Sequence, residues 1–99
     1  MVLGTLVFDL LLGDVHSLKG KRGVVRPLVA GLAREFGVSA AETASHDLHR
    51  RAELSVAVVG SAHGFVRDVL DGCERWVADR PEIEVLSTRR RVLDDDDLD

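Results

Sequence analysis

The sequence predicts an α+β fold, a two-layer sandwich in which two helices cover one face of an antiparallel four-stranded sheet. Segments with the alternation of strands and segments with helical periodicity follow one another in the order βαββαβ. Glycine or proline separates most of them, and no linker or internal repeat divides the chain. This order is the split βαβ arrangement of ferredoxin-like sandwiches. We therefore expect a single ferredoxin-like domain over residues 1–93.

The first strand and the first helix have clear boundaries. Residues 2–12 alternate along a strand, and apolar side chains on both of its faces predict a central position in the sheet. Ser17 is a suitable N-cap for a helix over about 18–36. Pro27 inside that helix predicts a kink, because its ring clashes with the carbonyl group four residues earlier.

The remaining elements follow at short intervals. Residues 38–45 and 51–59 are extended and flank a hairpin tip at 46–50, whereas 82–92 form the last strand. A second helix over about 62–79 ends before Pro81, because the residue before proline avoids helical angles. The apolar stripe expected to be buried on this helix contains Phe65, Val69, Cys73, Trp76 and Val77.

Composition limits the class of protein. A hydrophobic fraction of 45% predicts a folded chain, and one cysteine cannot form an intramolecular disulfide, which suits a reducing compartment. No long apolar run or signal peptide is apparent, so we expect a cytoplasmic protein without a membrane partner. Residues 94–99 contain five of the seventeen acidic residues and predict a disordered acidic tail. The remaining 93 residues carry thirteen Lys and Arg against twelve Asp and Glu.

One face of the predicted sheet is left without helices. A large apolar patch there predicts a homodimer, whereas a mixed, tolerated open face is the alternative. The residues expected at this dimer interface are Leu3, Val7, Leu11, Ala57 and Val59.

Two basic segments are expected at one edge of the sheet, which we call the loop edge. The first two strands run in the same direction in this topology, so the loop after the first strand and the hairpin at 46–50 emerge together. Cations beside the free N–H groups of a helix N-terminus favour an anion such as a phosphate of RNA or of a nucleotide. Ordinary surface charge is the alternative interpretation. The candidate anion- or RNA-binding residues are His16, Ser17, Lys19, Lys21, Arg22, His46, Asp47, Arg50 and Arg51.

Other chemistry receives little support. His46 and His49, with Asp47 and His16, could act as metal ligands, but no cysteine pair accompanies them, and we expect no metal or cofactor. No nucleophile stands out beside a base. Acylphosphatases share the strand order, yet the chain has no Asn or Gln to position a water molecule. A non-enzymatic protein is therefore favoured, although the sequence does not decide the question.

The segments VLGTLVFDLLL, HSLKGKR and SHDLHRRAELSVAVVGS resemble the YlxP-like family, domain of unknown function 503. The resemblance implies a small bacterial ferredoxin-like domain, often encoded near translation initiation and ribosome maturation factors. It places the family motifs on Ser17, Leu18, Lys19, Lys21, Arg22, His46, Asp47, Leu48, Arg51 and Ala52. We therefore expect a non-enzymatic RNA- or ribosome-associated accessory protein. The alternative is a dimeric ligand-sensing or protein-scaffolding module that acts through the open sheet face.

Overall fold

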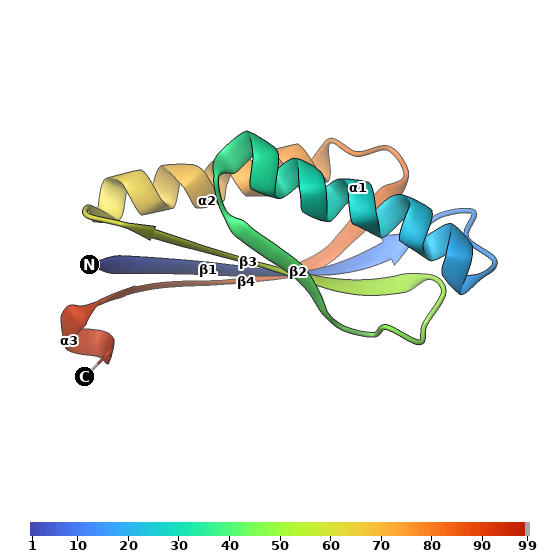
Figure 1. Ribbon diagram of the computed structural model, residues 1–99, viewed down its shortest axis with the longest axis horizontal. Coiled ribbons are helices and arrows are strands. Elements are labelled where there is room, and N and C mark those ends of the chain that lie inside the picture. Colours follow the sequence, from blue (N-terminus) through green and yellow to red (C-terminus); the bar gives the residue numbers. More distant parts are fainter. Residues whose placement is uncertain (99) are drawn as a thin grey trace.

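The computed structural model describes residues 1–98 and contains a four-stranded antiparallel sheet in the order β2-β3-β1-β4. The two long helices lie together on one face of this sheet (Figure 1). The elements are β1 (Val2–Leu12), α1 (Leu18–Phe36), β2 (Ser39–Ala44), β3 (Arg51–Gly60), α2 (His63–Ala78), β4 (Ile83–Asp94) and α3 (Asp95–Leu98). The predicted ferredoxin-like fold is confirmed.

The core lies between the sheet and the two helices. Alternate residues of β1, from Val2 to Leu12, are buried, and those between them are partly exposed on the opposite face. The central strand β1 pairs with both β3 and β4, as the apolar residues on both of its faces predict. The largest fully buried side chains include Phe8, Leu10 and Leu54.

Helix α1 begins and ends as the sequence predicts, and Pro27 lies inside it. The Ser17 hydroxyl accepts a hydrogen bond from the Gly20 N–H at 3.0 Å, and Gly37 ends the helix with a φ of 64°. The helix is assigned continuously from Leu18 to Phe36 with Pro27 inside it. Because Gly23 and Pro27 are both exposed, water can satisfy the carbonyl that proline leaves without a partner.

Helix α2 buries a different stripe from the one expected. Val66 and Leu70 face the core together with Cys73 and Val77, whereas the side chain of Phe65 is 55% exposed. The prediction was therefore wrong at Phe65, and Val69 is only partly buried. Both of these residues stand next to the true stripe, which has the same helical period.

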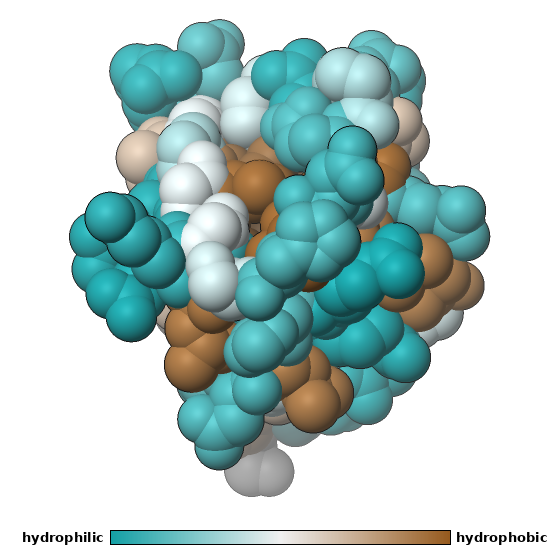
Figure 2. Space-filling view, turned by 90° about the vertical axis from the view of Figure 1, so that its right-hand side faces the viewer, coloured by the Kyte–Doolittle hydropathy of each residue, from teal (hydrophilic) through white to brown (hydrophobic). Residues whose placement is uncertain are grey.

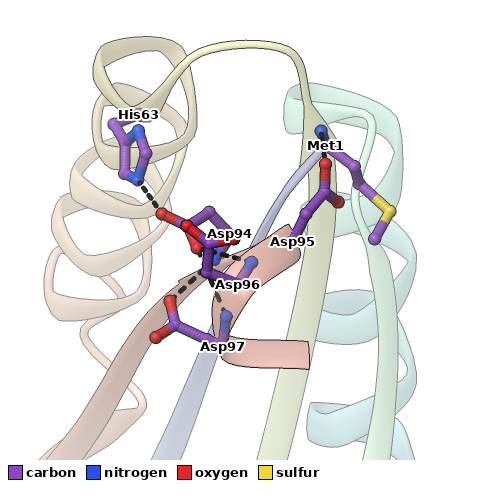
Figure 3. A network of polar contacts seen from close by, with 6 residues as sticks. All are labelled: Met1, His63, Asp94, Asp95, Asp96 and Asp97. Atoms are coloured by element: carbon purple, nitrogen blue, oxygen red, sulfur yellow. Dashed lines mark hydrogen bonds and ion pairs between the residues drawn. The ribbon is translucent and has the colours of Figure 1, made fainter. Parts of the chain in front are cut away.

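The acidic C-terminal residues are more ordered than expected (Figure 3). Strand β4 continues to Asp94, whose side chain accepts hydrogen bonds from the backbone N–H groups two and three residues later. The Met1 ammonium lies 3.2 Å from Asp95 Oδ2, and His63 Nε2 lies 3.6 Å from Asp94 Oδ2. Residues 95–98 form the short helix α3, where the sequence predicted a disordered tail. The last residue of the chain lies outside the described residues.

Within residues 1–98 no helix is both long enough and apolar enough to cross a membrane.

A candidate anion-binding edge and groove

The fold brings the two basic segments into direct contact at the loop edge. Lys21 of α1 reaches the hairpin, where its Nζ donates to the carbonyl of Ser45 at 2.5 Å and to that of His46 at 3.5 Å. The same ammonium lies 2.8 Å from Glu42 Oε2 of β2. This contact is an ion pair, and Glu42 Oε2 is buried beside the ammonium. Residues distant in the sequence thus meet at this edge.

Lys21 differs from the exposed cation that the sequence predicts. Its side chain is only 3% exposed, and a carboxylate and two carbonyls surround its ammonium. The sequence contains a signal for this burial, because Lys21 continues the stripe of Leu18, Val25 and Leu28 at helical spacing. Lys21 therefore holds the hairpin against α1 and does not offer a free positive charge.

Arg50 and Arg51 point in different directions, because neighbouring residues of a strand face opposite sides. The Arg50 Nε donates to the Leu12 carbonyl at 3.0 Å and closes the end of β1. Arg51 reaches over the open sheet face, where its guanidinium lies 2.5 Å from Asp9 Oδ2. The hydrogen bond and the attraction to Asp9 raise the pKa of Arg51. Only Arg50 therefore stays at the loop edge.

The other predicted residues are exposed around the start of α1 and the hairpin. Figure 2 looks onto this edge and shows a mainly hydrophilic surface with hydrophobic patches between the polar side chains. His46 Nε2 lies 3.2 Å from the Glu42 carbonyl, and Ser17 acts as the helix cap. The remaining ones are exposed and make no side-chain hydrogen bond or ion pair within residues 1–98: His16, Lys19, Arg22 and Asp47.

Three exposed cations follow one another along α1. Within residues 1–98, no ion pair joins Lys19, Arg22 or Arg26 to a carboxylate. Arg26 was missing from the predicted site, although it lies one helical turn after Arg22 and thus on the same side. We call Lys19, Arg22 and Arg26 the α1 cations.

A groove of about 510 Å³ runs between α1 and β2, within the size range of small-molecule sites. Apolar side chains of α1 form one wall, and Glu42 and His46 stand on the other side. Two of the α1 cations border it. The lining residues are Leu18, Lys21, Arg22, Val25, Arg26, Val29, Ala30, Glu42 and His46.

The open sheet face divides into an apolar end and a polar part. Leu3 pairs with Val59 of β3 and with Leu93 of β4, and the Val59 side chain is 61% exposed. In the polar part, Glu53 accepts a hydrogen bond from Arg89 at 3.1 Å. All five predicted interface residues lie on this face: Leu3, Val7, Leu11, Ala57 and Val59. The face is thus mixed, with its apolar part at one end.

The described residues offer little for metal or nucleophilic chemistry. No group of three or more His, Cys, Asp or Glu side chains within residues 1–98 is arranged to hold a metal ion. Cys73 is fully buried, and burial raises the pKa of its thiol to about 11. Since a thiolate is the reactive form, Cys73 is a packed core residue and not a nucleophile.

Comparison with known proteins establishes the family. The model of the family described as "Protein of unknown function (DUF503)" matches residues 3–90. The chain belongs to this family. It is similar to the uncharacterized protein YlxP of Bacillus subtilis (strain 168), with 27% identity over 88 residues that cover 89% of this chain and 96% of that protein.

A solved structure supports the fold. It is that of a mutant of SnoaB, a cofactor-independent oxygenase from Streptomyces nogalater, with a TM-score of 0.52 and 14% identity. The match covers 93% of this chain and 91% of that chain. At this identity the likeness concerns the fold alone.

Proposed function

We propose that this chain is a non-enzymatic cytoplasmic accessory protein that binds RNA, free or within the ribosome, through the α1 cations. The observation that carries the proposal is that three exposed cations without ion pairs follow one another on the same side of α1. Two of the three arginines of the open sheet face contact carboxylates, Arg51 with Asp9 and Arg89 with Glu53. The third, Arg91, has no carboxylate partner within residues 1–98. The α1 cations point away from the core and have no such partner within residues 1–98. They are therefore free to neutralise phosphates.

Binding of this kind is mainly electrostatic. The chain has three Phe, one Trp and no Tyr, and Phe8 is buried. Trp76 packs against Gly31, and the Arg80 guanidinium lies 4.3 Å from its ring centroid, which leaves little of the indole for a base. Phe65 is exposed, but it lies beside Gly60 at the end of β3 away from the loop edge. Without an aromatic side chain free for stacking near the α1 cations, affinity comes from counterion release and falls steeply with salt.

The test is fluorescence anisotropy with a labelled single-stranded RNA over a series of salt concentrations. We expect Lys19→Ala, Arg22→Ala and Arg26→Ala together to reduce affinity at low salt by at least about tenfold. They should also reduce the slope of log K against log salt by about two, because three phosphate contacts are lost. The matched control is Arg67→Ala, Arg75→Ala and Arg91→Ala, which removes the same charge from other exposed sites. Equal losses in both triple variants, or a salt-independent affinity, would contradict the proposal.

A second candidate function rests on the apolar end of the open sheet face. An exposed Val59 beside Leu3 and Leu93 favours a homodimer, the form that a scaffolding or ligand-sensing module requires. We expect Leu3→Asp with Val59→Asp to convert a dimer into a monomer in sedimentation equilibrium. Ala33→Asp, on the exposed side of α1, is the control and should leave the mass unchanged. A wild-type protein that sediments as a monomer at all concentrations would exclude this candidate.

A further inference from the structure

We infer that the groove between α1 and β2 is a base-binding subsite, which takes one unpaired nucleotide of the RNA whose base carries an exocyclic amino group. This inference rests on the proposed function. It adds a site with chemical selectivity to a surface that otherwise recognises only phosphate charge.

The groove exists because β2 cannot fill the space beside α1. β2 is an edge strand of six residues, and most of its side chains are those of Ala and Ser. The side of α1 that faces it carries larger apolar groups, among them Leu18, which is 37% exposed, and Val29. An apolar wall open to solvent beside a short edge strand suits the flat, apolar face of a base.

Charge favours a nucleotide over a neutral ligand. Arg22 and Arg26 stand on the rim of the groove, one helical turn and thus about 6 Å apart along the helix axis. When the base of a nucleotide enters the groove, the phosphate groups of that nucleotide stay outside, next to these guanidinium groups. A guanidinium group can bind a phosphate through two parallel hydrogen bonds. The same two side chains belong to the α1 cations, so backbone binding and base binding are continuous.

Glu42 supplies the selectivity. Its carboxylate is fixed by Lys21 at 2.8 Å, and its side chain keeps 20% exposure on the groove side. Its Oε2 is buried against the Lys21 ammonium, whereas its Oε1 accepts no hydrogen bond within the described residues and is the oxygen left for a base. A fixed carboxylate is an acceptor that attracts the amino group of cytosine, adenine or guanine. Uracil presents two carbonyl oxygens beside its single N–H group, and these repel the carboxylate.

The experiment compares labelled single-stranded oligomers of cytidine and of uridine of equal length, by fluorescence anisotropy at one salt concentration. We expect the cytidine oligomer to bind about tenfold more tightly, the effect of one hydrogen bond to a charged group. In parallel, cytidine 5′-monophosphate should shift the methyl resonances of Leu18, Val25 and Val29 in NMR spectra. Uridine 5′-monophosphate should shift them far less.

A steric variant tests the position of the base. Ala30 is exposed and lines the groove, so Ala30→Phe fills the groove without a change of charge or loss of a core contact. We expect it to abolish the preference for cytidine over uridine. The control is Ala33→Phe, also exposed on α1 but outside the groove, which should keep the preference.

The outcomes separate the two proposals. Equal affinity for both oligomers, together with a loss in the triple variant of the α1 cations, would overturn the base subsite and leave RNA binding intact. A cytidine preference that survives Ala30→Phe would also overturn the subsite, because the base would then lie elsewhere. If neither oligomer binds the unmodified protein, both proposals fail.

Discussion

The loop edge and the open sheet face both carry arginine, but the two regions use it differently. On the sheet face Arg51 contacts Asp9 of the neighbouring strand β1, and Arg89 of β4 reaches across β1 to Glu53 of β3. At the loop edge the α1 cations extend into solvent without carboxylate partners within residues 1–98. Charge on the sheet face thus supports the fold, whereas charge on α1 is available to a ligand.

Lys21 lies on α1 at the loop edge, but it stabilises the fold as the paired arginines of the sheet face do. It belongs to the loop edge by position, yet it is buried and paired with Glu42. Two residues earlier, Lys19 is exposed and unpaired within the described residues. Burial and partners, and not the residue type, decide which cations hold the fold together.

The largest expected effect comes from Lys21→Ala. Removal of one partner of a buried ion pair leaves the other charge uncompensated, so the free energy of unfolding should fall by about 3–5 kcal/mol. Urea unfolding followed by circular dichroism measures this. Lys19→Ala is the matched control and should change stability by no more than about 0.5 kcal/mol. Similar values for the two variants would erase the distinction between paired and free cations at this edge.

The glycines of α1 provide the next test. A Cβ atom at Gly31 would lie 2.5 Å from the Trp76 ring, so Gly31→Ala should destabilise the protein by about 1–3 kcal/mol. A Cβ atom at Gly23 would meet no atom within 4 Å apart from its own stretch of helix, so Gly23→Ala should stabilise the protein by about 0.5–1 kcal/mol.

Thermal unfolding compares these two glycine variants. Gly23→Ala should also leave RNA affinity unchanged, since no cation moves. A loss of affinity in this variant would show that the loop edge needs a flexible helix as well as charge.

A smaller effect is expected for the ion pairs of the sheet face. The Arg51 and Asp9 side chains are 44% and 37% exposed, so their pair should contribute only about 0.2–1 kcal/mol. A double-mutant cycle with Arg51→Ala and Asp9→Ala measures this coupling. Added salt should weaken it. A coupling well above this range would mean that the open face is covered in solution, as a dimer would require.

The smallest expected effect is the loss of structure around Asp94 at low pH. Hydrogen bonding from the Asp97 backbone, together with the nearby His63, lowers the pKa of Asp94. A carboxyl with a lowered pKa in the folded state stabilises that state above its ordinary pKa of about 3.9, and the contribution is lost as pH falls through the lowered value. Amide exchange at Asp96 and Asp97 should therefore be slow at neutral pH relative to their intrinsic rates and lose protection in acid. In Asp94→Ala the protection should be absent at every pH.

The order of elements was predictable because strands and helices impose different periods on apolar residues. Phe65 was misassigned because a helix can shift its buried stripe by one residue without a change of period. The order of Asp94 was missed for another reason. Five acidic residues predict mutual repulsion, but the Met1 ammonium and His63 lie at the same end of the sheet, a juxtaposition that only the fold creates.

At the loop edge, the order of the strands correctly predicted that the two segments lie together. It did not predict which of their side chains are buried. A lysine side chain is long enough to place its ammonium either among buried groups, as Lys21 does, or in solvent, as Lys19 does. The groove between α1 and β2 was not predictable, because it results from the small side chains of β2 and not from a sequence motif.

The buried thiol of Cys73 has a practical consequence. With its pKa raised to about 11, almost none of it is ionised near neutral pH, and the side chain is shielded from reagents. A thiol-specific dye can react only after the sheet and α2 separate. Because the chain has one cysteine, the labelling rate would report how often this single site becomes exposed. The labelling rate of Cys73 thus gives a direct measure of the opening of the core, and it can be compared between the wild-type protein and every variant above.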